Sequence, residues 1–301
     1  MLSRLAESFF WMGRYIERAE GTTRLLVEVH QLLVQDNGPE QQRGIECVLR
    51  GLGFENAGPA DLVSMVSTIY GSAEVPGSIM GSLDFARSNA RSVRDALPAD
   101  FFEVLNKAHM KAMVVPDPHF PGASLREVLE GLAVVHGVFD WVSPRDEAHS
   151  FYELGCYVER IDMVGRLLNM RLESGWPEQG PATLLRSVAG LSTYLRRHVR
   201  MTADSVRAFL LLDGMFPRSI LRSVIEAEAS IREIADHTST RAEPVLRAIG
   251  LLRGQLEYAG DDMSDEAIDR LVSQALRAVE STSSAVRDNF FRPVGSIVWS
   301  H

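Results

Sequence analysis

The sequence is short of cysteine and of long uncharged apolar runs, and each shortage excludes a class of protein. Its two cysteines, Cys47 and Cys156, can form neither a disulfide framework nor a cysteine-rich metal site. We therefore expect reduced, buried thiols and a cytoplasmic protein. No apolar run approaches the roughly 20 residues of a membrane span, and the charged residues near Met1 interrupt any signal-peptide core.

Positive charge is also scarce, which argues against a nucleic-acid binder. The 31 lysines and arginines are outnumbered by 40 aspartates and glutamates, giving a formal net charge of −9. Nucleic-acid binding needs a basic face, so neither a nucleic-acid nor a membrane partner is expected. Lys107 and Lys111 are the only lysines. This arginine bias reflects either genome composition or a use of guanidinium groups in buried ion pairs.

Apolar residues with helical spacing dominate the chain. From Leu2 to Leu33 they recur at alternating steps of three and four, which predicts one continuous helix of about 30 residues. The same stripe recurs from Phe151 to Leu172. A capping box at Ser124-x-x-Glu127 and the pair Ser143-Pro144 indicate further helix starts. No segment shows the period of two that a strand requires, so the predicted fold class is all-α.

The chain also repeats itself. The stretch SFFWMGRYIERAEGTTRLL from Ser8 has a near-copy, SFYELGCYVERIDMVGRLL, that begins at Ser150. A second match pairs EVPGSIMGSL (74–83) with MFPRSILRSV (215–224) at almost the same offset. These matches predict a duplicated unit much longer than a solenoid repeat. We expect two related helical bundles, residues 1–142 and 143–301, packed about an approximate twofold axis as one compact unit.

Each copy of the first motif places the same kinds of residue on one helix face. The sets recur at steps of four, three and four: Gly13, Glu17, Glu20 and Arg24 in the first copy, and Gly155, Glu159, Asp162 and Arg166 in the second. Glu20 can pair with Arg24 along its own helix, as Asp162 can with Arg166. A glycine inside a helix costs about 1 kcal/mol relative to alanine, so its repetition predicts the close approach of another backbone.

Three segments resemble the bacterial Alpha-E domain family: WMGRYIERAE near the N-terminus, NARSVRD (Asn89–Asp95) and LLLDGMFPRSI (Leu210–Ile220). The resemblance covers essentially the whole chain and implies an all-helical domain of unknown function. It also implies a context, because members are encoded beside or fused to circularly permuted ATP-grasp ligases that are thought to join amino acids or peptides. An ATP-grasp ligase is therefore the expected partner, and no catalytic role is settled for the helical domain.

The repeated motif has two main interpretations. Its residues can form a buried ion-pair lattice between the halves, with Glu17 crossing to Arg160 or Arg166 and a reciprocal pair across the axis. Alternatively, arginines clamp a carboxylate or phosphate while acidic groups take an amine. A partner surface is a third, smaller possibility. The candidate residues are Arg14, Glu17, Arg18, Glu20, Arg24, Glu159, Arg160, Asp162 and Arg166.

Two further groups of residues are secondary candidates. Arg87, Arg91 and Arg94 share a face of one predicted helix. Arg218 lies at a predicted helix start, where it opposes the helix dipole and indicates a partner carboxylate. The full secondary set is Arg87, Asn89, Arg91, Arg94, Asp213, Arg218 and Arg222.

Familiar catalytic motifs are missing. There is no G-x-S-x-G elbow, phosphate-binding loop, G-x-G-x-x-G or H-E-x-x-H. A di-iron bundle needs Glu-x-x-His on two helices, whereas here only Asp146-x-x-His149 has that spacing, so neither a metal nor a cofactor is expected. The predicted function is an accessory or binding partner of an ATP-grasp amide or peptide ligase. The alternative is a stand-alone enzyme acting on an amino-acid or peptide derivative, with Glu17 or Glu159 as general base. Oligomeric state is not predicted.

Overall fold

The computed structural model describes residues 3–35, 38–54, 61–75, 77–170, 180–238, 242–260 and 264–291. Within these ranges the chain forms thirteen α-helices and no strand. The all-α fold class predicted from the apolar spacing is confirmed.

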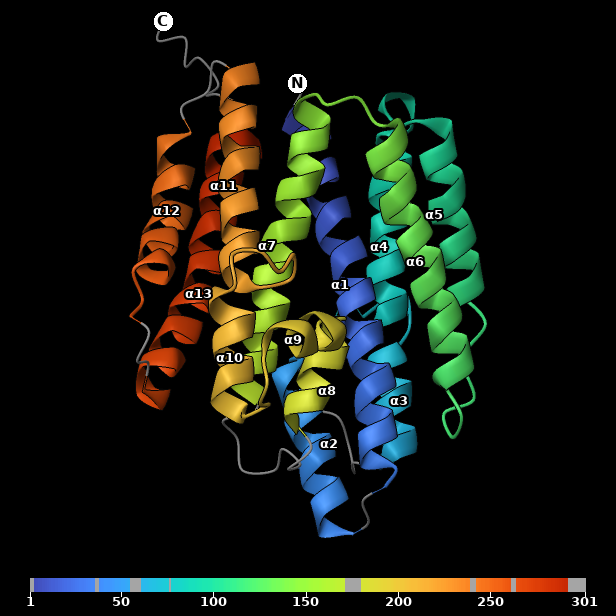
Figure 1. Cartoon of the computed structure of the whole chain (residues 1–301). Helices are drawn as coiled ribbons and strands as arrows, with labels where there is room; N and C mark the ends of the chain where they lie inside the picture. Colours follow the sequence, from blue (N-terminus) through green and yellow to red (C-terminus); the bar gives the residue numbers. More distant parts are fainter. Residues whose placement is uncertain are drawn as a thin grey trace, which may run out of the picture.

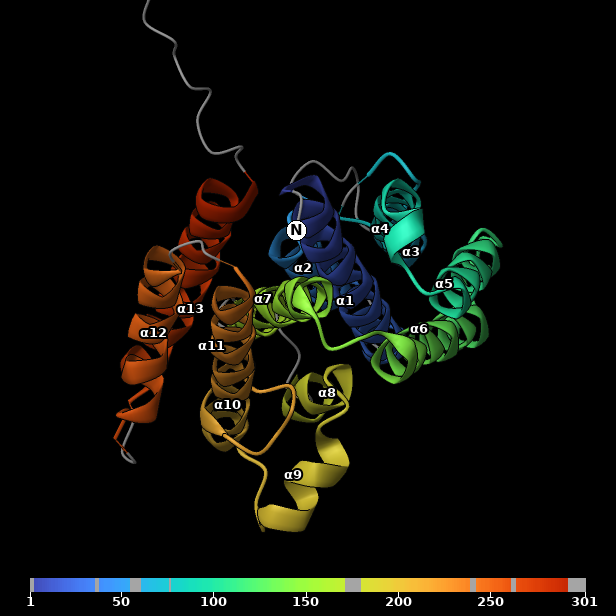
Figure 2. The same cartoon turned by 90° about the horizontal axis from the view of Figure 1, so that it is seen from above.

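Two long helices form the centre of the molecule. α1 (Ser3–Leu33) has 31 residues, as the long apolar stripe predicts, and α7 (Glu147–Met170) has 24. They lie side by side in the two views, in blue and light green (Figures 1 and 2). Both helices bury polar residues as well as apolar ones, because the faces that meet carry the repeated Glu-Arg motif.

The other helices flank this pair on two sides. α1 packs against α4, and α7 packs against α11 and α13. Figure 1 shows α4 to α6 on one side and α11 to α13 on the other, with α2 and α8 near one end of α1. Their bounds are α2 Pro39–Gly51, α3 Leu62–Tyr70, α4 Ile79–Ser92, α5 Ala99–Ala112, α6 Gly122–Val142, α8 Gly180–Ser187, α9 Leu191–Arg197, α10 Ala203–Leu212, α11 Ile220–His237, α12 Glu243–Glu257 and α13 Asp265–Val286, with a 3-10 turn η1 at Arg94–Ala96 and a π turn η2 at Arg287–Phe291.

Serines cap several of the flanking helices, whereas two predicted helix starts are wrong. Ser78 and Ser219 precede α4 and α11, and each side-chain oxygen accepts a backbone N–H of the first turn. Ser124 lies inside α6, which begins at Gly122, so it does not cap that helix. Ser143 ends α6, and the carboxylate of Asp146 accepts the first N–H groups of α7.

The described part of the chain shows where the two cysteines lie and whether any helix could span a membrane. None of the helices described there combines the length and apolar character needed to cross a bilayer. Cys47 and Cys156 are buried, and neither forms a disulfide. The Cys156 thiol donates to the carbonyl oxygen of Gly13 at 3.4 Å, so it belongs to the α1–α7 contact.

Candidate functional site at the crossing of α1 and α7

Gly13 and Gly155 lie where the backbones of α1 and α7 touch. A Cβ added to Gly13 would lie 2.1 Å from the carbonyl oxygen of Tyr152, and one added to Gly155 would lie 2.1 Å from that of Phe10. No side chain fits at either position. This close approach offsets the intrinsic penalty of a glycine within a helix.

Two arginines of α1 hold Glu159 of α7. The Arg14 Nε donates to Oε2 at 2.7 Å, and the Arg18 Nε and Nη2 donate to Oε1 and Oε2 at 2.5 and 2.9 Å. Glu159 has no exposed surface, and Arg14 also donates to Ser283 on α13 at 3.1 Å. Burial alone would raise the pKa of Glu159, but Arg18 and Arg14 lower it to about 2.

The reciprocal contact places Glu17 of α1 against Arg160 of α7. The Arg160 Nε and Nη2 donate to the two oxygens of Glu17, each at 2.7 Å. Arg218, from the loop before α11, adds a donor to Glu17 at 3.3 Å and another to Glu20 at 2.6 Å. Although burial opposes ionisation, Arg160 and Arg218 keep the pKa of Glu17 below its usual value, and Arg218 does the same for Glu20.

The remaining motif residues pair within their own helices. Arg24 donates to Glu20, and Arg166 donates to Asp162, each at 2.8 Å. Of the two partners considered for Glu17, Arg160 therefore contacts it and Arg166 does not. All nine residues of the primary candidate set take part in these contacts at the α1–α7 crossing, which we call the ion-pair lattice.

The lattice predicts that the protein loses stability in acid. The pKa of Glu159 is lowered in the folded state, so its contribution is complete above the unfolded value near 4.5 and falls as the pH drops toward 2. That contribution is about 3 kcal/mol. Urea unfolding between pH 6 and pH 2.5 should show the loss. Glu159→Gln should have a shallower pH dependence over the same window, and an unchanged dependence would contradict the pairing.

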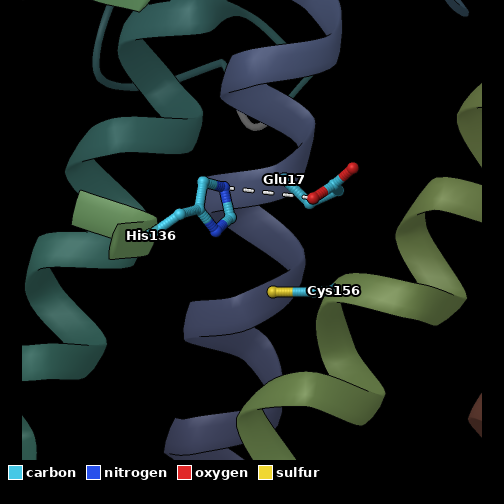
Figure 3. A group of neighbouring side chains, drawn as sticks. All are labelled: Glu17, His136 and Cys156. Atoms are coloured by element: carbon cyan, nitrogen blue, oxygen red, sulfur yellow. Dashed lines mark ion pairs between the residues drawn. The ribbon is translucent and has the colours of Figure 1, made fainter. Parts of the chain in front are cut away.

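His136 and Cys156 extend the lattice on the Glu17 side. Figure 3 shows His136 from α6 and Cys156 from α7 beside Glu17 of α1. The His136 Nε2 lies 3.4 Å from Glu20 and 4.0 Å from Glu17, and no sequence motif marked this histidine as a candidate. One ligand atom from each of Glu17, His136 and Cys156 lies within 4.8 Å of the others.

Histidine, cysteine and carboxylate are ligands that zinc accepts, so among the described residues these three form a group that could hold a metal. Their surroundings favour ion pairs instead. Arg160 already donates to both oxygens of Glu17, and burial raises the pKa of the Cys156 thiol well above its usual value. A metal here would have to displace a guanidinium group and remove the proton of the thiol.

Two of the cavities bounded by described residues adjoin α1. The smaller cavity, of about 110 Å³, lies on the Glu159 side of the lattice, and several of its lining residues, including Glu159 and Thr22, are buried. It is lined by Arg18, Thr22, Leu52, Gly77, Glu159, Asp162, Met163 and Arg166. The larger, of about 420 Å³, lies between α1 and α4 and includes Trp11, Tyr15 and Asn89 among its lining residues. Only the smaller contains residues of the primary candidate set.

The secondary candidates on and just after α4 do not form one site in the structure. α4 ends at Ser92, so Arg94 lies in the following 3-10 turn, and the predicted shared face with Arg87 and Arg91 is wrong. Arg87 donates to Asn106 at 2.7 Å, Arg94 stacks on Phe102 at 4.3 Å, and Arg91 is exposed. The Asn89 side chain bonds to a carbonyl of its own helix.

Of the second group, only Arg218 reaches the ion-pair lattice. It precedes the cap Ser219, and its expected partner carboxylates are those of Glu17 and Glu20. Asp213 instead accepts from Arg197 at 2.6 Å and from two backbone N–H groups of its own turn. Arg222 pairs with Glu226 along α11.

Glu153 on α7 is an ionisable residue that the sequence reasoning missed. Burial is the main cause that raises its pKa to about 7, and neighbouring carboxylates such as Glu233 add to the effect. His149 lies 3.5 Å from it. Glu153 lines neither of the two cavities described above. A raised pKa on a partly exposed side chain, outside both of these cavities, gives it no defined role.

The geometry places one Glu-Arg dipeptide of each central helix at the crossing, Glu17-Arg18 and Glu159-Arg160. Residues 1–291 match a family model described as a predicted alpha-helical domain with a conserved ER motif. The chain belongs to the Alpha-E family. These two dipeptides are the only Glu-Arg pairs in the sequence, and in this Alpha-E chain they pair with each other across the two helices, Arg18 with Glu159 and Arg160 with Glu17.

The similar curated proteins are mycobacterial and longer. The uncharacterized proteins Mb2597 of Mycobacterium bovis and MT2643 of Mycobacterium tuberculosis are each 23% identical to this Alpha-E chain, and Rv2567 of Mycobacterium tuberculosis is 22% identical. Each match covers 95% of this chain and 36% of the relative, so the chain spans about a third of their length. No solved structure matches the chain.

Proposed function

We propose that this Alpha-E protein is a non-catalytic partner of an ATP-grasp ligase that forms amide or peptide bonds. It engages the ligase, or its amino-acid or peptide substrate, through the Arg/Glu-lined cavity at the α1–α7 crossing. The observation that carries the binding role is the state of the buried carboxylates. A general base at neutral pH works best with a pKa near 7, whereas that of Glu159 is about 2 and Glu17 is also held ionised. These groups suit recognition rather than proton transfer.

The ligase as partner rests on the family resemblance. The curated relatives support it indirectly, because the region similar to this chain is about a third of each of those polypeptides. In those proteins the helical region is joined to additional sequence, as expected for a domain that works beside another one.

An exposed apolar segment supports a protein partner. At the end of α5 and in the loop before α6, Met113, Val114, Val115 and Phe120 are between 61% and 81% exposed. Several large apolar side chains exposed along one short segment are typical of an interaction surface. We propose this segment as the part that contacts the ligase.

We also propose that the chain arose by duplication of one helical unit, with halves at residues 1–142 and 143–301. Gly13 and Gly155 exchange equivalent backbone contacts, and Ser78 and Ser219 cap α4 and α11 in the same way. The arginine of each Glu-Arg dipeptide also stacks on the tyrosine three residues before it, at 5.7 Å for Arg18 and 5.4 Å for Arg160. Each equivalence supports an approximate twofold axis through the crossing.

Reconstitution tests the partnership. The chain is expected to co-purify with an ATP-grasp ligase encoded beside it and to increase ATP consumption and product mass with at least one amino acid of a panel. Val115→Glu should weaken co-purification at least tenfold, because it places a charge in the apolar segment. Leu251→Glu is the matched control, since Leu251 is 68% exposed on α12, away from that segment.

Two results would contradict the proposal. One is unchanged ligase activity and no complex in the presence of the folded chain. The other is conversion of a peptide derivative by the chain alone that disappears in a folded Glu17→Gln variant, which would support the stand-alone enzyme.

A further inference from the structure

The two sides of the ion-pair lattice differ at several matched positions, and one of them is the residue before a capping serine. Arg218-Ser219 aligns with Gly77-Ser78 in the second repeated match of the sequence. The structure gives both serines the same contacts, because Ser219 Oγ bonds to the carbonyl oxygen of the residue six before it, and Ser78 Oγ does likewise at 3.1 Å. Gly77 therefore stands on the Glu159 side where Arg218 stands on the Glu17 side.

As a consequence, the Arg218 side chain fills the site beside Glu17, whereas a cavity remains beside Glu159. The Arg218 guanidinium bridges Glu17 and Glu20. Gly77 has no side chain, and it lines the cavity of about 110 Å³ beside Glu159 and Asp162. This volume holds a few water molecules or a molecule of four or five heavy atoms, and it is well below the size of a drug-sized pocket.

Cationic groups are in excess around this cavity. In the lining, Glu159 and Asp162 supply two negative charges and Arg18 and Arg166 supply two positive ones. Arg14 does not line the cavity but binds Glu159, and it adds a third positive charge. Glu159 is bound by a second arginine, Arg14, just as Glu17 is bound by a second arginine, Arg218. The absence of a side chain at Gly77 therefore leaves no carboxylate unpaired. The local balance is one positive charge, which a monovalent anion would neutralise.

Two arginines that line the cavity keep N–H donors that no described residue accepts. Arg18 uses Nε and Nη2 on Glu159, and its Nη1 makes no hydrogen bond to the described residues. Arg166 uses Nε on Asp162, and its two terminal nitrogens likewise make none. Guanidinium groups bind carboxylates through such paired N–H donors.

We propose that this cavity binds a small monocarboxylate, held by the guanidinium groups of Arg18 and Arg166. The charge balance favours one negative charge over two, and the nearby carboxylates of Glu159 and Asp162 oppose a divalent phosphate. The inference deepens the binding role proposed above by giving its ligand class. It is tested without the ligase, so either proposal can fail while the other stands.

The test is a titration of the full chain with sodium acetate, sodium phosphate and guanidinium chloride at equal ionic strength, followed by NMR. Acetate is expected to bind with a dissociation constant on the order of 1 mM, since so small a ligand has few contacts. Phosphate and guanidinium should bind at least tenfold more weakly. Tighter binding of either one, or no binding of acetate, would overturn the proposal.

Two variants locate the site. Gly77→Leu should fill the cavity and weaken acetate binding at least tenfold, and its Cβ would meet only Phe54 ring atoms at 3.7 and 3.8 Å. Gly250→Leu on α12 is its control, because nothing lies within 4 Å of a Cβ there. Arg166→Gln should weaken binding about tenfold by removing a charged donor. Arg24→Gln removes the matched arginine on the other side, which does not line the cavity, and should leave binding unchanged. Acetate binding that survives both Gly77→Leu and Arg166→Gln would place the ligand elsewhere.

Discussion

Gly155→Ala is expected to destabilise the protein by about 3 kcal/mol or more and to reduce its soluble yield. The added Cβ would lie 2.1 Å from the carbonyl oxygen of Phe10 and 3.1 Å from the backbone nitrogen of Arg14. Backbone atoms of a packed helix cannot move aside as a flexible side chain can, so α1 and α7 would have to separate. Separation would lengthen the ion pairs on both sides of the crossing. Chemical denaturation followed by circular dichroism measures the effect.

Gly137→Ala supplies the matched control within α6. A Cβ at Gly137 meets nothing within 4 Å, so alanine should raise stability by up to about 1 kcal/mol through its higher helix propensity. If Gly155→Ala were as well tolerated as Gly137→Ala, the close approach of the two central helices would be wrong.

Glu159→Ala is expected to lower stability by about 3–5 kcal/mol, because it leaves two buried or partly buried guanidinium groups without their carboxylate. For a protein of this size, the midpoint of thermal unfolding should fall by about 10 °C. The side chain of Arg14 is 7% exposed and that of Arg18 is 22% exposed, so neither reaches water freely. Differential scanning calorimetry at pH 7 gives both quantities.

Glu103→Ala removes a glutamate from an ion pair of a different kind. Glu103 and Lys107 pair along α5 with side chains 63% and 67% exposed. Exposed pairs along a helix contribute little because water screens them, so this variant should unfold within about 2 °C of the wild type. Equal effects of Glu103→Ala and Glu159→Ala would show that burial does not strengthen the pairing of Glu159.

The ion-pair lattice and the cavity beside it are explained by the same pairing of buried charges. Isolated buried charges are unfavourable, and a lattice is stable only where its members are paired. On the Glu17 side Arg218 completes the set, whereas on the Glu159 side the completing arginine comes from α1 and Gly77 leaves space. A cavity lined by rigidly held charged side chains is suited to selecting a ligand by its charge.

Much of the fold and the heart of the candidate site could be predicted from local patterns. The stripe from Leu2 to Leu33 gave the long central helix because its spacing follows one helix face. The paired glycines indicated the close backbone approach because a helix rarely keeps so unfavourable a residue without a packing reason. Arg160 was one of two partners considered for Glu17, and helix geometry alone could not choose between them.

What the sequence could not supply came from other elements. His136 and Ser283 reach the lattice from α6 and α13, and neither has a local signal that marks it. The predicted face of Arg87, Arg91 and Arg94 failed because α4 ends at Ser92, and a helix end without a glycine or proline gave no warning. The cavity depends on the packing of several segments around Gly77, which periodicity does not describe.

A double-mutant cycle between Arg18 and Glu159 tests the account most directly. Unfolding free energies of the wild type, Arg18→Met, Glu159→Gln and the double variant give the coupling of the two side chains across the α1–α7 crossing. Two hydrogen bonds in a site where Glu159 has no exposed surface predict a coupling of about 2 kcal/mol. A coupling within about 0.3 kcal/mol of zero would mean that the Glu-Arg motifs do not meet at the centre of the protein.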